Sequence, residues 1–412
     1  MLVQRTEQHI IDRQSLWYIM LQEKCHQAKN IYNHGNFIIR QEFIKNGKWL
    51  RYIEVEQLVK NDAIYTDYWD WKLANSGQQV LRQLDKNWKS FFKSIKDWSK
   101  NKNKYLGKPK LPKYLKKDGL CEFALTTQQV KLKSDNLIHF PKSMLGFTIK
   151  PHFIYDERFI QFNQCRIVPR NDRIIVELVY TIAIEDKPIE ISNIGSIDLG
   201  IDNFVTFIDN LGSKPIIING KGLKSCNKYY NELISKTKSE LDLNKNKRYS
   251  HKLYSITNKR NDRVKYFMHN VSKYIVNLCR SLNITTLIVG KNSTWKQNCN
   301  MGKINNQTFV QIPYNRFIQQ LTYKCQEVGI NLILVDEAYT SGTSFLDNEE
   351  PVKELYNKKR RIHRGLFRSN DGRLINADVN AAYQIMRKVF HDVEIPVDRG
   401  FVMNPTQISI IC

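Results

Sequence analysis

Two apolar runs with a helix-type segment between them restrict what the C-terminal half of this chain can fold into. The runs are TTLIVGKN (285–292) and NLILVDEAYTS (331–341), and the segment NRFIQQLTYKCQEVGI (315–330) has apolar residues at spacings of three and four. A strand that is apolar without alternation is typical of one buried on both faces. The order strand, helix, strand predicts an α/β sheet.

Further strands and helices flank this core. IGSIDLGIDNFVTFIDNLG (194–212) contains two β-type runs joined at Gly200 to Asn203, which predicts a hairpin that begins a mixed sheet. Residues 221–282 form a long helical stretch whose basic side chains face either phosphate or solvent. INADVNAAYQIMRKVF (375–390) has the apolar spacing of a closing helix.

The N-terminal half divides by periodicity into a helical part and a β part. Residues 15–100 carry apolar residues at helical spacing. Residues 101–117 contain seven lysines and no acid, with Gly107 and two prolines, and predict an extended basic connector. Residues 120–185 change to short alternating segments, which predict a small β domain, a barrel or half-barrel.

The charge of the chain indicates a polyanionic partner. Lys and Arg number 64 against 40 Asp and Glu, a formal charge of +24. Neutralising phosphates releases counterions and drives binding, so nucleic acid is the natural partner. A soluble basic enzyme and a membrane-surface binder are the alternatives.

The cysteine pattern and the N-terminal segment indicate where in the cell the protein is expected. The eight cysteines are scattered and form no CxxC, which argues against a zinc ribbon and a disulfide framework and favours a reduced cytosol. The N-terminal segment is too polar for a signal peptide, and no apolar run approaches the roughly 18 residues of a membrane span. We therefore expect a cytoplasmic protein.

Three acidic residues stand out by their placement. Asp198 lies within an apolar strand, where a carboxylate is costly to bury unless it is paired or binds metal. Glu337 ends a second apolar strand, and Asp378 lies at a helix start, where it could simply cap the helix. Each alone could be a structural carboxylate. However, Asp198 lies on a hairpin strand, Glu337 on a later parallel strand and Asp378 on the closing helix. In this arrangement the three carboxylates can converge at one edge of the sheet.

Three converging carboxylates predict metal-dependent phosphodiester chemistry. Hard oxygen ligands suit Mg²⁺ or Mn²⁺. Two such ions roughly 4 Å apart can activate water and stabilise the departing oxygen, so we expect hydrolysis of nucleic acid that leaves 5′-phosphate and 3′-hydroxyl ends. A P-loop, GxGxxG and HExxH are absent, and the histidines are dispersed without ligand spacing. An ATP-driven or zinc hydrolase is therefore disfavoured.

Many segments, in one order along the chain, resemble the TnpB family of insertion-sequence nucleases, which is related to type V CRISPR effectors and Fanzor proteins. They are QQVLRQLDKNWKSFFKSIKDW, GKPKLPKYLKKDG, FALTTQQVKL, RIVPRNDRIIVELVY, IGSIDLGIDNFVTF, LIVGKNSTWKQ, VDEAYTSGTSFLD and RIHRGLFRSNDGRLINADVNAAYQIMRK. The resemblance implies an α/β fold with additional β and α domains. An RNase H-like (RuvC) nuclease domain follows an N-terminal wedge-type β-barrel that is interrupted by a helical recognition domain.

The resemblance also implies domain limits and partners. The wedge domain would comprise residues 1–14 and 101–190, the recognition domain 15–100, and the RuvC domain 191–340 and 376–412. Residues 341–375 would be a target-nucleic-acid-binding insert. Such proteins bind a noncoding guide RNA and cleave double-stranded DNA beside a short flanking motif. Whether the chain acts as a monomer or a homodimer is left open.

The sequence departs from the family pattern at two places. Where most relatives carry the second catalytic glutamate, this chain has Gly290, which cannot ligate metal. Glu337 on the neighbouring strand is the predicted replacement, as in a subgroup with a relocated glutamate, and Asp336 is the fallback. Adjacent strand residues face opposite sides, so only one of the two can point at the site. The insert lacks the paired CxxC motifs of relatives, so we expect no structural zinc.

Nucleic-acid contacts are carried over from the resemblance. Asn75, Gln78 and Thr126 match the places that read the flanking motif, and amide side chains suit bidentate reading of adenine. Gln78 could equally cap or solvate its helix. In the insert, Arg360, Arg361 and Arg364 are expected to contact phosphate, with a solvated basic loop as the alternative.

Two other functions compete with an active guided nuclease. The loss of the acid at Gly290 makes a nuclease-dead, RNA-guided repressor credible, although Asp198 and Asp378 are both retained. A strand-transferring transposase of RNase H fold is the third possibility, and a transesterification assay would test it.

Overall fold

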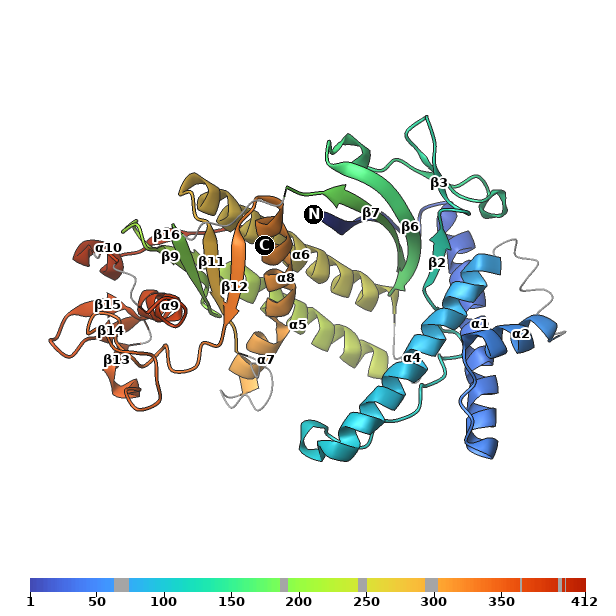
Figure 1. Cartoon of the computed structure of the whole chain (residues 1–412), viewed down its shortest axis with the longest axis horizontal. Coiled ribbons are helices and arrows are strands. Elements are labelled where there is room, and N and C mark those ends of the chain that lie inside the picture. Colours follow the sequence, from blue (N-terminus) through green and yellow to red (C-terminus); the bar gives the residue numbers. More distant parts are fainter. Residues whose placement is uncertain are drawn as a thin grey trace. The chain divides into compact units, whose positions relative to one another are not determined.

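The computed structural model describes residues 1–62, 74–185, 192–243, 250–292, 303–363, 365–391, 395–396 and 398–412. Figure 1 traces the chain from blue to red. It divides into two units, Met1–Ile184 and Glu185–Cys412. The finer division into wedge, recognition, RuvC and insert domains stays a prediction.

Three α-helices and two antiparallel sheets are the main elements in the described part of the first unit. The helices are α1 (Trp17–Asn46), α2 (Tyr52–Asn61) and α4 (Ala74–Lys100). The larger sheet has the order β1 (Leu2–Ile11), β7 (Arg173–Ala183), β6 (Phe159–Arg170), β2 (Phe123–Thr126). The smaller sheet has the order β3 (Lys131–Leu132), β4 (Ile138–His139), β5 (Thr148–Ile149). Single 3-10 turns are η2 (Lys102–Lys104), η3 (Lys142–Met144) and η4 (Phe153–Tyr155).

The two sheets of this unit are open among the described residues. The larger one ends at β1 on one side and at β2 on the other. The predicted β-barrel is therefore not confirmed. A closed barrel requires its first and last strands to pair, and the alternating pattern that predicted these strands carries no information about closure.

Helices α1 and α4 pack closely. Gly35 of α1 makes this possible, because a Cβ there would lie 2.7 Å from Leu81 Cδ2 of α4. The fully buried Trp88 donates its indole N–H to Asn36 Oδ1 at 3.0 Å, which satisfies the polar atom of the largest buried side chain in the contact.

The second unit is built on a six-stranded mixed sheet. Its order is β12 (Asn331–Val335), β11 (Thr286–Gly290), β8 (Ile194–Leu199), β9 (Asn203–Asp209), β10 (Ile216–Asn219), β16 (Thr406–Ile408). β8, β9 and β10 form an antiparallel meander, whereas β11 and β12 run parallel to β8. The predicted hairpin and the later parallel strands are thus both present.

Helices cover both faces of this sheet. They are α5 (Lys221–Leu243), α6 (His251–Ser281), α7 (Lys303–Gln311), α8 (Tyr314–Glu327), α9 (Ala377–Arg387) and α10 (Arg399–Met403). Leu287 and Val289 of β11 belong to a core shared with α6 and α8, whereas Ile288 belongs to a core shared with α9. Strand alternation therefore distributes the apolar run TLIV between two cores.

A small three-stranded sheet lies in sequence between β12 and α9. It consists of β13 (Arg361–His363), β14 (Leu366–Arg368) and β15 (Leu374–Asn376), preceded by the turn η5 (Lys358–Arg360). Phe367 and Ile375 are buried in the core that α9 forms, and Phe345 stacks on Tyr383 with ring centroids 4.3 Å apart. Apolar packing thus fastens this segment to the main sheet.

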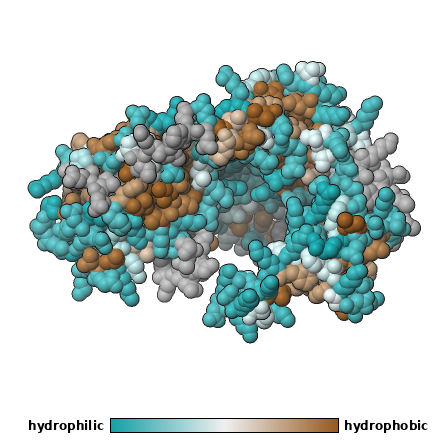
Figure 2. Space-filling model, in the orientation of Figure 1, coloured by the Kyte–Doolittle hydropathy of each residue, from teal (hydrophilic) through white to brown (hydrophobic). Residues whose placement is uncertain are grey.

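Hydrophilic side chains predominate on the face shown in Figure 2, and apolar ones gather in separate patches. None of the described helices combines the length and the apolar character that crossing a membrane requires.

Candidate active site

Asp198 projects from the central strand β8 toward the face of the sheet that α9 covers. Ile194, which shares its side of the strand, packs in the core with α9, whereas Ile197 packs on the opposite face with α6 and α8. Burial raises the pKa of the Asp198 carboxyl well above its usual range, and the carboxylates of Asp378 and Glu337 raise it further. The three acids are therefore close enough to repel one another.

Asp378 lies in the first turn of α9 but does not cap the helix. The cap is Asn376, whose side chain accepts hydrogen bonds from the backbone N–H groups of Asp378 and Val379 at 3.0 and 3.2 Å. The Asp378 carboxylate instead accepts from Asn203 Nδ2 at 2.6 Å and from the Arg361 guanidinium at 3.1 Å. Helix capping therefore does not explain Asp378.

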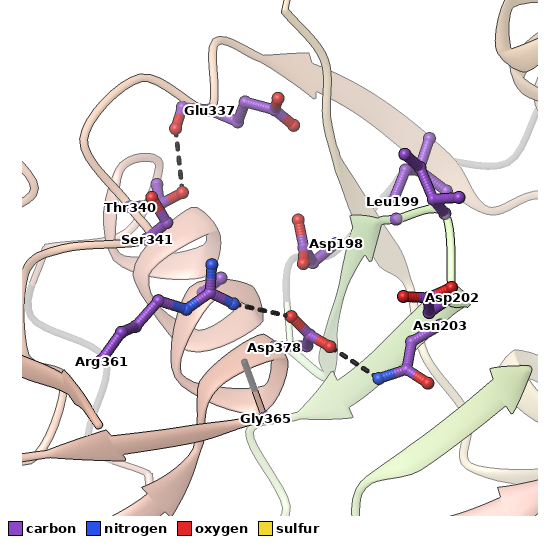
Figure 3. A pocket seen from close by; sticks show the side chains of 13 residues that line it. Asp198, Leu199, Asp202, Asn203, Glu337, Thr340, Ser341, Arg361, Gly365 and Asp378 are labelled. Carbon is purple, nitrogen blue, oxygen red and sulfur yellow. Dashed lines mark hydrogen bonds and ion pairs between the residues drawn. The ribbon is translucent and has the colours of Figure 1, made fainter. Parts of the chain in front are cut away.

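Glu337 lines the same cavity as the two aspartates. β12 ends at Val335, and the following turn is fixed by the Thr340 hydroxyl, which donates to the Glu337 carbonyl oxygen at 2.9 Å. Figure 3 shows the three carboxylates facing one space, with Asp198 between Glu337 and Asp378. The cavity has a volume of about 470 Å³.

The neighbouring acid, Asp336, does not line this cavity. Its carboxylate accepts from the Ala338 backbone N–H at 3.3 Å, and its carbonyl oxygen accepts from Lys388 Nζ at 3.0 Å. Of the two adjacent acids that the sequence offered, Glu337 is the one that the fold directs toward Asp198.

Gly290 lies beside Glu337 at the end of β11. A Cβ built on Gly290 would lie 3.5 Å from Glu337 Cβ and only 2.6 Å from Ile385 Cδ1 of α9. A side chain at position 290 would therefore enter the region that Glu337 and Ile385 fill. Glu337 occupies the region toward which position 290 points.

Comparisons with known proteins found two matching families and similar solved structures. Residues 177–296 match the family OrfB_IS605, described as a probable transposase. Residues 314–385 match the Cas12f1-like TNB domain. Among solved structures, the chain is similar to Cas12f1 in a complex with sgRNA and target DNA, with a TM-score of 0.54 and 17% identity, covering 90% of this chain and 82% of that one.

Over these two segments the chain resembles TnpB-like RuvC proteins. At 17% identity the structural likeness concerns the fold alone. A CRISPR-Cas12f ternary complex is also similar, at 18% identity over 89% of this chain and 80% of that one, but its TM-score of 0.38 is too low to support an argument. No curated protein matches the chain.

Sequence reasoning did not assign the side chains that hold Asp378. Asn203 and Arg361 both hold Asp378, and the Arg361 guanidinium also acts to lower the pKa of Asp198. Arg361 was predicted to contact phosphate. No local sequence pattern predicts its ion pair with Asp378, 17 positions away, because this contact depends on how β13 packs beside α9.

Arg360 and Arg364 were also predicted to contact phosphate. Arg360 donates to Glu349 Oε2 at 2.6 Å and also bonds Asn370, so its guanidinium is held by side chains of the segment between β12 and α9. Arg364 lies outside the described residues. Phosphate contacts by these side chains stay predictions.

The candidate motif-reading residues lie in the first unit. Asn75 at the start of α4 donates to Gln128 Oε1 at 2.9 Å, in the turn that follows Thr126. Gln78 donates to Glu56 Oε1 at 2.7 Å. The Thr126 hydroxyl is buried and has no hydrogen-bond partner among the described residues. The structure thus brings Asn75 near the turn after β2 but ties Gln78 to α2.

Proposed function

We propose that this chain is an RNA-guided, metal-dependent DNA endonuclease of an insertion sequence. It would bind a noncoding guide RNA and cut double-stranded DNA beside a short flanking motif. The observation that carries the proposal is the convergence of Asp198, Glu337 and Asp378 on one cavity. The formal charge of +24 favours a nucleic-acid partner, and the similar Cas12f1 structure contains sgRNA and target DNA.

The cavity fits divalent metal ions. Its donors are carboxylate oxygens, the ligands that Mg²⁺ and Mn²⁺ prefer. The raised pKa of Asp198 reflects burial and two neighbouring carboxylates, and a bound cation would offset that repulsion. Asp198, Glu337 and Asp378 would hold the ions. Bound Mg²⁺ or Mn²⁺ would make water more acidic and stabilise the departing oxygen of the phosphodiester.

The surrounding side chains orient one of these ligands and favour the ionised form of another. Asn203 and Arg361 each bond one oxygen of Asp378 and so fix the orientation of its carboxylate. The Arg361 guanidinium also favours the ionised form of Asp198. It lines the cavity, where its positive charge would attract the anionic phosphodiester.

Glu337 is proposed as the relocated catalytic glutamate. The 3.5 Å separation between Glu337 Cβ and the Cβ position at Gly290 supports this assignment, because a carboxylate from either strand would reach the same region. Ile385 explains why position 290 itself could not carry the longer side chain without repacking.

The test is cleavage of a plasmid library with randomised flanks, in Mg²⁺, by protein copurified with its RNA. Wild type should cut, Glu337→Ala should bind the same DNA without cutting, and Asp336→Ala should cut like wild type because Asp336 lies outside the cavity. Loss of cutting in Asp336→Ala alone would exchange the roles of the two acids. Cutting retained in Glu337→Ala would refute the relocation.

A guided repressor is the second candidate, and Gly290 is the observation that favours it. Sequence-specific binding without cutting by wild type, under conditions where the RNA is bound, would establish this function. Single-strand transfer products would point to a transposase instead.

The flanking motif is proposed to be read by Asn75, Gln78 and Thr126. The hydrogen bond from Asn75 to Gln128 supports a reading surface formed by α4 together with the turn after β2. In the library experiment, Asn75→Ala should change the preferred bases of the flank. An unchanged preference with weaker overall binding would instead assign Asn75 to backbone contacts.

A further inference from the structure

Two histidines and a glutamate meet at an edge strand of the first unit. Glu7 and His9 lie two positions apart on the same face of β1, and His152 directly precedes η4. His9 Nε2 lies 2.6 Å, and His152 Nδ1 2.8 Å, from the same oxygen of Glu7. All three ligand atoms lie within 4.8 Å of one another. The imidazole rings are stacked, with centroids 5.8 Å apart and planes at 14°.

The backbone fixes the Glu7 carboxylate at the centre of this group. Oε2 accepts from the N–H groups of His152 and Phe153, at 2.9 and 3.0 Å, and the His152 N–H also lies 2.9 Å from Oε1. Three nitrogens therefore point at Oε1, an oxygen with about two lone-pair sites. Without a metal, each ring nitrogen donates its N–H to Oε1, and a bound ion would take the place of these two protons.

We infer that Glu7, His9 and His152 form a second metal site, separate from the carboxylate cavity, for a borderline transition-metal ion such as Zn²⁺. Two imidazole nitrogens and one carboxylate oxygen are a ligand set that suits Zn²⁺ far better than Mg²⁺. The His152 side chain is 84% exposed, so solvent reaches the site and water could supply a fourth ligand. Metal binding requires both rings to be neutral, with Nε2 of His9 and Nδ1 of His152 unprotonated.

Only a small movement is needed to accept the ion. Tetrahedral ligands at about 2.0–2.1 Å from Zn²⁺ lie roughly 3.3 Å apart, whereas each ring nitrogen now lies 2.6 or 2.8 Å from Glu7 Oε1. Each nitrogen must therefore move away from that oxygen by about half an ångström. His152 is free to do so because most of its side chain is in solvent.

The site would connect distant parts of the chain. Glu7 and His152 are 145 positions apart, and β1 is an edge strand that pairs only with β7 in the described sheet. A bound ion would therefore fasten β1 to the segment that precedes β6. From the sequence we expected no structural zinc, because it lacks paired cysteines. The structure instead brings histidines together, and this inference does not depend on the proposed nuclease function.

Zinc binding by the full-length chain tests the inference. Protein stripped with a chelator is titrated calorimetrically with Zn²⁺ in excess Mg²⁺, which would fill the carboxylate cavity. Wild type should bind one Zn²⁺ that His152→Gln and His9→Gln bind at least tenfold more weakly. At a hundredfold excess over Kd, Zn²⁺ should raise the melting temperature of wild type by roughly 5–10 °C. His139→Gln is the matched control, because His139 also bonds a carboxylate, Asp135 at 2.6 Å, but belongs to no cluster of three ligand side chains among the described residues.

The experiment distinguishes a loss of metal binding from a loss of folding. Because His152 is mostly exposed, its replacement should leave the fold intact, and a circular dichroism spectrum checks this. Equal Zn²⁺ affinity and stoichiometry in wild type, His152→Gln and His9→Gln would overturn the inference, as would the same loss in His139→Gln. Co²⁺ gives a second readout, since the intense visible absorption of a four-coordinate ion should appear in wild type and be absent in His152→Gln.

Discussion

A single methyl group at position 290 should destabilise the second unit. In Gly290→Ala the new Cβ would lie 2.6 Å from Ile385 Cδ1, about 1 Å inside the ordinary carbon–carbon contact of roughly 3.5–4.0 Å. Ile385 is fully buried in the core with α9, so it has little room to turn. Overpacking of this kind costs about 1–3 kcal/mol.

Shortening Ile385 should compensate. Ile385→Val removes the Cδ1 atom that makes the contact and by itself costs about 0.5–1.5 kcal/mol. Combined with Gly290→Ala, it should recover about 1–2 kcal/mol, a coupling expected for side chains in contact. Thermal melting of the four proteins of this cycle measures it, because 1 kcal/mol corresponds to about 2–4 °C in a unit of this size.

Gly107→Ala is the control, because a Cβ there meets nothing within 4 Å. The reasoning is refuted if Gly290→Ala melts like wild type, or if Ile385→Val adds to the loss instead of reducing it. The double variant should retain cleavage, since Glu337 is unchanged. Glutamate at position 290 should restore cutting to Glu337→Ala only when Ile385 is shortened as well.

Two further variants probe the charges of the cavity. Asp198 has a raised pKa in the folded protein, so its ionisation opposes folding, and stability is lost as pH rises from the ordinary carboxyl pKa toward the raised value. In chelator, Asp198→Asn should therefore melt above wild type at neutral pH, the two should converge in acid, and cleavage should be lost; equal melting at neutral pH would contradict the burial argument. Arg361→Gln should lower the cleavage rate about 10- to 100-fold and raise the Mg²⁺ concentration for half-maximal cutting, because Asp378 loses a partner. Arg360→Gln, which loses a bond to Glu349, should leave that Mg²⁺ requirement unchanged, and a similar shift in both variants would argue against a local role of Arg361.

The regular elements could be predicted because their signals are local. The run TLIV became β11, the segment from Tyr314 became α8, and the hairpin at Gly200 became β8 and β9. In each case, the period of apolar residues reports which sides of the element are buried. The predicted barrel was not confirmed, because sheet closure depends on pairing between strands that are far apart in the chain.

The candidate site was predicted only in outline. The apolar surroundings of Asp198 marked it as exceptional, and the order of the elements suggested that Glu337 and Asp378 would join it. Strand alternation allowed either Asp336 or Glu337, and the choice depended on how the chain turns after Val335. The partners of Asp378 were equally inaccessible, because they come from β9 and β13.

The sequence by itself determined the basic charge, the alternation of strands and helices, and the few acids placed where burial is costly. These properties depend on composition and on neighbours a few positions apart. Only the tertiary structure decided that Glu337 lies where a side chain from Gly290 would point, that Arg361 binds Asp378, and that His9 meets His152. Each of those contacts joins residues brought together by sheet pairing and helix packing, whose geometry no local pattern encodes.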